Sequence, residues 1–154
     1  MLGKKFRLTK AGAEELRDEL SKLLNERGQI AERIKIAREF GDLTENAEYQ
    51  SSRQEQDKNE TRISEVEHIL QNVAIIESPR GGGKVQLGSK VKLKGNNNKS
   101  REFQVVGTVE ANPLSGKISD ESPIGRALLG KAVGEEVEIK TPLETSTFTI
   151  TDIS

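Results

Sequence analysis

The sequence predicts an α+β protein in which an N-terminal antiparallel helical hairpin precedes a C-terminal antiparallel β-sheet domain with one short helix. Three observations support this fold class. Apolar residues recur at helical spacing up to residue 73, side chains alternate in steps of two beyond residue 84, and a stretch rich in Pro and Gly separates the two patterns. We therefore expect a coiled-coil hairpin at 1–77, a linker at 78–83 and a second domain at 84–154.

The first helix should follow Phe6–Thr9, with Thr9 as its N-cap. From Leu16 onwards, one face repeats in alternating steps of four and three. That pattern is typical of a helix packed along a second helix at a shallow angle. The positions in this seam are Leu16, Leu20, Leu23, Arg27, Ile30, Ile34 and Ala37.

The second helix shows the same steps when it is followed backwards from Val73. Its inner half is apolar and its outer half is polar, so we expect burial to stabilise the base of the hairpin and hardly its tip. At 1.5 Å per residue, residues 44–73 would make an arm about 45 Å long. The seam positions are Val73, Leu70, Val66, Ile63, Asn59, Gln56, Ser52 and Tyr49.

Between the helices lies a short acidic turn. Gly41 follows the first helical run and is expected to end it, because glycine accepts the left-handed conformation. Asp42 and Glu45 then stand at the tip of the hairpin. Their spacing fits a capping box with Asp42 as N-cap, although Thr44 could be the cap instead. Two carboxylates cannot enclose a divalent ion, so they would form a metal site only if a partner supplied further ligands.

The second half should hold five short strands, a hairpin loop and one helix. The loop is expected at residues 95–100, and the helix at 122–129, where Ser and Pro open it. Phe103 and Phe148 occupy strand positions that suit core packing. The expected strands are 85–87, 90–94, 103–106, 137–139 and 148–150.

Composition excludes several classes of protein. The chain has no cysteine, which excludes a disulfide framework and a thiolate metal site. Residues 1–78 hold 13 Lys and Arg against 16 Asp and Glu, and residues 79–154 hold 11 against 9, so neither half has the basic excess of an autonomous nucleic-acid binder. The N-terminus lacks the apolar run of a signal peptide, and no apolar run is long enough for a membrane span, so we expect a cytoplasmic protein.

Two motifs resemble those of a known family. The first is Ala37-Arg38 with Gly41-Asp42-Leu43, continued by Glu45-Asn46-Ala47-Glu48-Tyr49 and Gln56; the second is the run from Ser122 to Lys131, SPIGRALLGK. Together they resemble the GreA-type bacterial transcript cleavage factors, and the similarity extends through nearly the whole chain. The resemblance implies an FKBP-like fold for the second domain. FKBP prolyl isomerases line their pocket with aromatics, and residues 84–154 contain no Trp or Tyr, so we do not expect isomerase activity.

The resemblance also implies a function. In this family the hairpin enters the secondary channel of RNA polymerase and stimulates the hydrolysis of backtracked nascent RNA by the polymerase's own active site. By position, Asp42 would help to hold a second Mg²⁺ together with polymerase carboxylates, and Glu45 would orient or activate the attacking water. The protein would then be a monomeric accessory factor and not an enzyme, with no cofactor of its own beyond that shared Mg²⁺. Its partners would be bacterial RNA polymerase and the RNA 3′ end, with no membrane.

Other residues have two interpretations each. Arg33, Arg38 and Arg53 could lie on a solvated helix face, or they could contact the phosphates of displaced RNA. Ser122 and Pro123 could contact the polymerase, as the resemblance implies, or could simply open the short helix. Two alternative functions also remain open: a secondary-channel regulator that modulates or inhibits the polymerase without cleavage, and a free-standing FKBP-type binding module.

Overall fold

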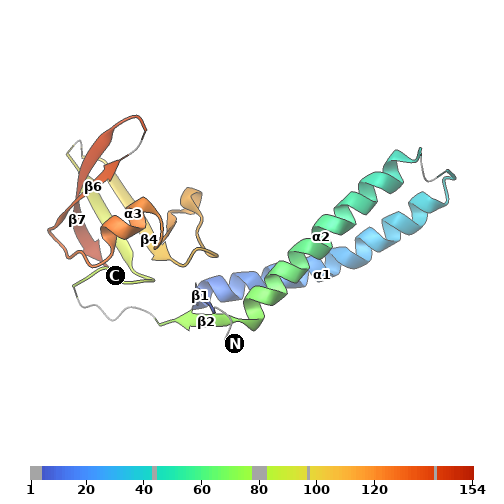
Figure 1. The fold of residues 1–154 in the computed structure, drawn as a ribbon, viewed down its shortest axis with the longest axis horizontal. Helices are drawn as coiled ribbons and strands as arrows, with labels where there is room; N and C mark the ends of the chain where they lie inside the picture. Colours follow the sequence, from blue (N-terminus) through green and yellow to red (C-terminus); the bar gives the residue numbers. More distant parts are fainter. Residues whose placement is uncertain (1–4, 43–44, 78–82, 97, 141) are drawn as a thin grey trace. The chain divides into compact units, whose positions relative to one another are not determined.

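The computed structural model describes residues 5–42, 45–77, 83–96, 98–140 and 142–154. Figure 1 shows two long helices side by side and, further along the chain, a curled β-sheet with a short helix. The chain divides into two compact units. One holds Ala13–Val73, and the other holds Lys5–Gly12 together with Ala74–Ser154.

The helical unit is the predicted antiparallel hairpin. Helix α1 covers Lys10–Arg38 and α2 covers Ala47–Gln71. Most buried residues of the hairpin fall on the predicted seam: Ile30, Ile34 and Ala37 on α1, and Asn59, Ile63 and Val66 on α2. Near the end of α2 the predicted seam is wrong by one residue, because Ile69 is buried and Leu70 is only half-buried. Arg27, the one charged seam position of α1, stays exposed and forms a salt bridge of 2.7 Å with Glu60 on α2.

The expected decrease in burial towards the tip is wrong. Ile34 and Ala37, in the last two turns of α1, are only 5% and 2% exposed. The expectation weighed the polar side chains of the outer half of α2 and overlooked the apolar side chains that α1 supplies opposite them. Apolar burial therefore stabilises the hairpin close to its tip as well as at its base.

The base of the hairpin differs from the prediction in one respect. Helix α2 ends at Gln71, with Asn72 as C-cap, and Val73–Ile76 form a strand, β2, that pairs with β1 (Phe6–Thr9) in a two-stranded sheet. Both strands are four residues long, too short to show a period of their own. Thr9 is the N-cap of α1 as predicted, since its Oγ1 accepts a hydrogen bond of 3.0 Å from the Gly12 N–H.

The second unit is built on a five-stranded sheet in the order β5-β4-β3-β7-β6. Its core contains Val91, Leu93, Phe148 and Ile150 from the central strands, and Phe103 packs against them at the margin. Helix α3 (Pro123–Leu128) contributes the fully buried Leu128 to this core. The strands are β3 (Lys90–Gly95), β4 (Ser100–Val106), β5 (Lys117–Ser119), β6 (Glu136–Lys140) and β7 (Thr145–Ile153), and a 3₁₀ turn, η1, covers Pro113–Ser115.

The predicted fold class is confirmed, with two corrections in the sheet. The sheet is mixed and not purely antiparallel, because β5 pairs with β4 in parallel. The expected strand at 85–87 is absent from the structure: Lys84 forms an isolated bridge to Ala132, and a turn follows at Gly88, which has φ +94°. In that turn the Ser89 hydroxyl accepts from the Gln86 N–H at 2.9 Å, so the backbone leaves the extended conformation.

None of the helices in the described ranges contains an apolar stretch long enough to cross a lipid bilayer.

Candidate functional site at the hairpin tip

Helix α1 ends in a tightened turn that leads into the tip. The Glu39 N–H donates to the Ile36 carbonyl at 3.1 Å, and the Phe40 N–H donates to the Ala37 carbonyl at 3.2 Å. Gly41 follows with φ +105°, a conformation that favours glycine. The prediction that Gly41 ends the first helix is therefore confirmed.

Asp42 and Glu45 are both exposed residues in the segment between the helices. Leu43 and Thr44, which lie between them, fall outside the described residues. The alternative interpretation of Asp42 as the N-cap of α2 is wrong, because the helix begins at Ala47 and its N-cap is Asn46. Since both acidic residues precede the N-cap, their spacing of three does not form a capping box.

Asn46 is a tip residue that the sequence analysis did not single out. Its Oδ1 accepts from the Tyr49 N–H at 3.1 Å, and its Nδ2 donates to the Ala37 carbonyl at 2.6 Å. The same side chain thus caps α2 and bonds to the last turn of α1. A signal was available in the sequence, because Asn is among the strongest N-cap residues and here directly precedes a helical run.

The predicted RNA-binding arginines each have a neighbour. The Arg38 guanidinium carbon lies 5.9 Å from the centre of the Tyr49 ring, a cation–π arrangement that joins α1 to α2. Arg33 forms a salt bridge of 2.9 Å with Glu55 across the hairpin, and Arg53 donates to Gln56 at 2.7 Å within α2. All three arginines are exposed residues, so these contacts orient cations on the outer half of the hairpin without burying them.

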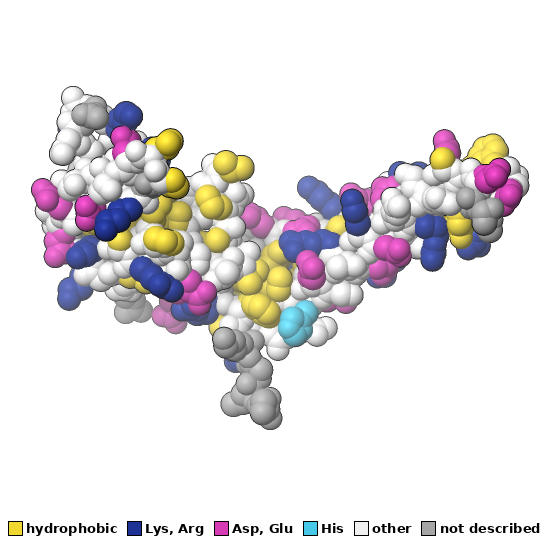
Figure 2. Space-filling view, turned by 45° about the horizontal axis from the view of Figure 1, so that its top comes forward, with side chains coloured by type: hydrophobic (Ala, Val, Ile, Leu, Met, Phe, Trp, Pro, Cys, Tyr) yellow, Lys and Arg dark blue, Asp and Glu magenta, His cyan; other side chains and the backbone are white. Residues whose placement is uncertain are grey.

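Apolar side chains are also exposed near the tip. Figure 2 shows hydrophobic side chains among acidic ones at the end of the hairpin. The large exposed apolar residues that the structure describes in this region are Phe40, which is 71% exposed, and Ile36, which is 46% exposed. Phe40 directly precedes Gly41 and Asp42 in the chain.

The acidic pair does not make a metal site by itself. Among the residues that the structure describes, no three His, Cys, Asp or Glu side chains are grouped so that they could hold an ion. Mg²⁺ prefers six oxygen ligands and usually takes one or two carboxylates together with waters and phosphates. Exposed carboxylates such as Asp42 and Glu45 fit that chemistry only as part of a larger ligand set.

Ser122 and Pro123 have a structural role in the second unit. Ser122 is the N-cap of α3: its Oγ accepts from the Gly125 N–H at 3.1 Å and donates to the Ser119 carbonyl at 2.6 Å. Pro123 occupies the first turn, where its missing N–H costs nothing. These contacts confirm the interpretation of the pair as helix openers, and Pro123 remains exposed.

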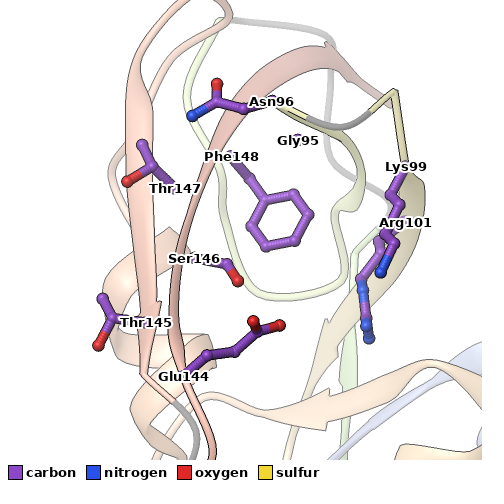
Figure 3. A pocket seen from close by; sticks show the side chains of 9 residues that line it. All are labelled: Gly95, Asn96, Lys99, Arg101, Glu144, Thr145, Ser146, Thr147 and Phe148. Carbon is purple, nitrogen blue, oxygen red and sulfur yellow. The ribbon is translucent and has the colours of Figure 1, made fainter.

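The second unit also contains a polar cavity of about 290 Å³ between the β3–β4 hairpin and the start of β7. Figure 3 shows Lys99 and Arg101 on one side of Phe148, and Glu144 and Ser146 pointing towards it from the other side. None of the predicted site residues lines this cavity. Its lining comprises Gly95, Asn96, Lys99, Arg101, Glu144, Thr145, Ser146, Thr147 and Phe148.

Comparisons with known proteins agree with the motif resemblance. Residues 6–75 match the family described as "Transcription elongation factor, N-terminal", and residues 79–154 match "Transcription elongation factor, GreA/GreB, C-term". The chain is 48% identical over 140 residues to transcription elongation factor GreA of Acholeplasma laidlawii, covering 90% of this chain and 89% of that one. It is 44% identical over 153 residues to the GreA of Clostridioides difficile, covering 97% and 96%.

Solved structures give a weaker likeness. The crystal structure of GreA factor homolog 1 from Thermus thermophilus is 34% identical, covers 98% of this chain and 99% of that chain, and has a TM-score of 0.46. The assignment therefore rests on the sequence matches, which extend over both halves of the chain. On that basis, the chain belongs to the GreA/GreB family of transcription elongation factors.

Proposed function

We propose that this protein enters the secondary channel of RNA polymerase and stimulates the Mg²⁺-dependent hydrolysis of backtracked RNA by the polymerase active site. The observation that carries the proposal is the placement of Asp42 and Glu45 as exposed carboxylates between the helices, outside the cap of α2. Structural capping was the main alternative explanation for their spacing. Asn46 takes that role, so helix capping does not account for the acidic pair.

In this proposal the two carboxylates have separate tasks. Asp42 contributes an oxygen ligand to a Mg²⁺ that polymerase carboxylates hold in part, and the bound ion supplies Lewis-acid stabilisation of the reacting oxygens. Glu45 orients the attacking water and accepts its proton. The protein is then an accessory that completes a site, and Mg²⁺ is shared with the polymerase and not a cofactor of this protein alone.

The arginines and the second unit would supply contacts with the partners. Arg33, Arg38 and Arg53 are exposed residues on facing helices, a suitable arrangement for phosphates of the displaced RNA 3′ end. Ser122 and Pro123 would contact the polymerase surface through the exposed side of the α3 N-terminus. We place the protein in the cytoplasm as a monomer, in keeping with its role on the polymerase.

The proposal predicts that Asp42→Asn abolishes RNA shortening in backtracked polymerase complexes. Asn removes the charge that recruits Mg²⁺ but keeps the shape, so the melting temperature should not change. Glu45→Gln should reduce the cleavage rate by about 10²-fold, as is typical for the loss of an acid–base group. Raising the Mg²⁺ concentration should partly restore Asp42→Asn, where the defect is ion occupancy, and restore Glu45→Gln less.

Two controls make this experiment specific. Asp57→Asn and Glu32→Gln remove the same charges from exposed positions on α2 and α1 away from the tip, and both should cleave like the wild type. Free RNA with Mg²⁺ and no polymerase should stay intact. Full cleavage by both tip variants would contradict the assignment of Asp42 and Glu45. A wild-type protein that slows the polymerase without shortening its RNA would instead support a secondary-channel regulator.

A further inference from the structure

Asn46 joins the two helices at the point where the acidic tip segment leaves and rejoins them. It directly follows Glu45, is half-buried, and has the extended backbone of an N-cap, with φ −85° and ψ +97°. Its Nδ2 donates to the carbonyl of Ala37, and its Oδ1 accepts from the N–H of Tyr49. One amide therefore closes the loop that contains Asp42 and Glu45.

The carbonyl of Ala37 is a fixed partner. Ala37 is 2% exposed in the last turn of α1, and its oxygen also accepts from the Phe40 N–H at 3.2 Å. A donor bonded to this carbonyl is thus tied to a part of α1 that packing already holds in place. The hydrogen bond therefore holds the backbone of residue 46 next to the end of α1, and Glu45 is the residue directly before it.

Only an amide of this length can make both bonds. Ser or Asp at residue 46 would still accept from the Tyr49 N–H, because both are good N-caps. Ser is too short to reach the Ala37 carbonyl from that position, and Asp has no proton to donate and would place its charge against the carbonyl oxygen. The capping function and the bond between the helices can therefore be separated by substitution.

We propose that Asn46 is a positioning residue, which holds the tip segment on the end of α1 so that the Glu45 and Asp42 carboxylates reach a reacting phosphodiester in productive geometry. This inference rests on the proposed function. Displacement of a catalytic group by about 1 Å can reduce a rate by about 10²-fold. Loss of the bond from Nδ2 to Ala37 should therefore lower the cleavage rate without weakening the interaction with polymerase.

The hairpin offers a matched control in Asn59. Its Nδ2 donates to the Leu23 carbonyl across the same helix pair at 3.1 Å, and Asn59 is 7% exposed in the middle of α2. Asn59→Ser removes a donor of the same chemistry from the same interface. It should lower stability without altering the tip.

The test compares Asn46→Ser, Asn59→Ser and the wild type in backtracked polymerase complexes. Rates are measured over a range of factor concentrations, so that the maximal rate and the half-saturating concentration are separated. Asn46→Ser should lower the maximal rate roughly ten- to hundredfold and leave half-saturation unchanged. Asn59→Ser should melt at a lower temperature yet reach the wild-type maximal rate. Hydrogen exchange of the Tyr49 amide should stay slow in Asn46→Ser, since the cap is retained.

The outcomes separate the inference from the function on which it rests. If the wild type stimulates cleavage and Asn46→Ser reaches the same maximal rate, the positioning role is overturned while the proposed function stands. If Asn46→Ser and Asn59→Ser lose maximal rate equally, the bond from Asn46 is a general structural contact and the inference fails. If the wild type stimulates no cleavage, the proposed function itself fails.

Discussion

At the scale of single residues, two helical glycines have opposite surroundings. A Cβ placed on Gly125, in α3, would lie 2.0 Å from the backbone oxygen of Ser119, whereas a Cβ on Gly28, in α1, meets nothing within 4 Å. Backbone atoms cannot move aside cheaply, so Gly125→Ala should destabilise the protein by about 1–3 kcal/mol. Gly28→Ala should stabilise α1 by about 0.5–1 kcal/mol, because Ala loses less entropy in a helix.

Chemical unfolding of both variants checks this prediction. The transition of the second unit should move to lower denaturant in Gly125→Ala, and the transition of the hairpin should move to higher denaturant in Gly28→Ala. Wild-type unfolding of Gly125→Ala would show that α3 can shift away from β5 without cost, contrary to the packing described above.

Residue chemistry could be predicted where one local rule applied and not where two competed. Thr9 and Ser122 were correctly predicted as N-caps, because Thr9 directly precedes the helical pattern and Pro123 marks the first turn after Ser122. At the tip, Asp42, Thr44 and Asn46 are all good caps, and local spacing could not choose among them. Asn46 also bonds to the Ala37 carbonyl, a contact that depends on the arrangement of two helices and that local spacing cannot reveal.

At the scale of elements, the hairpin contains an ion pair that links its stability to pH. Arg62 on α2 donates from Nη2 to the Glu19 carboxylate on α1 at 2.9 Å, with a second bond from Nε. Hydrogen bonding to Arg62 holds the pKa of Glu19 below its usual value, although partial burial opposes this shift. Because the pKa is lowered in the folded state, the pair stabilises the hairpin at pH values above the unfolded pKa of Glu19. This stabilisation is lost as the pH falls through the folded pKa.

We therefore predict that Glu19→Gln lowers the free energy of unfolding of the hairpin by an amount that depends on pH. At pH 7 the variant should lose no more than about 1 kcal/mol, because both side chains are more than a third exposed and solvent screens the pair. As the pH falls through the folded pKa of Glu19, the difference from the wild type should shrink towards zero. Urea unfolding at a series of pH values measures the difference in the free energy of unfolding. A difference that persists in acid would mean that packing, and not charge, underlies the effect.

Elements were predictable in proportion to their length. The two long helices carry many seam positions, so their pattern was clear even with Arg27 and Asn59 within it. Strand β5 has three residues and β1 and β2 have four each, which is too few to show alternation. Conversely, Val85 and Leu87 alternate like a strand, but Gly88 and Ser89 turn the backbone there.

At the scale of the whole molecule, the compact units do not follow the order of the chain. The segment Lys5–Gly12 belongs to the same compact unit as Ala74–Ser154, although it lies at the start of the sequence. Contacts with the segments that follow β4 and β5 account for this. Arg7 forms a salt bridge of 2.7 Å with Asp120, and the Glu110 carboxylate accepts from the Thr9 N–H at 2.7 Å. Local sequence patterns cannot indicate these pairs, because a hundred or more residues separate the partners.

Glu110 is therefore expected to cap the first turn of α1 together with Thr9. The Thr9 hydroxyl donates to Glu110 at 2.6 Å and accepts from the Gly12 N–H, and the Glu110 side chain is only 4% exposed. Gly12 fits this arrangement, since a Cβ there would lie 2.4 Å from the Glu110 carboxyl carbon. A hydrogen bond to a buried charged group is stronger than one between neutral groups, by roughly a factor of two.

A double-mutant cycle tests this coupling. Thr9→Val and Glu110→Gln should each destabilise the second unit, and the double variant should lose less than the sum, with a coupling of about 1–3 kcal/mol. Thr9→Val combined with Glu138→Gln, an exposed position on β6, should be additive within about 0.5 kcal/mol. Denaturant unfolding of the full chain supplies all the values. Additivity in the Thr9–Glu110 cycle would mean that the two residues act independently. Other contacts, such as that between Arg7 and Asp120, would then have to hold Lys5–Gly12 in the second unit.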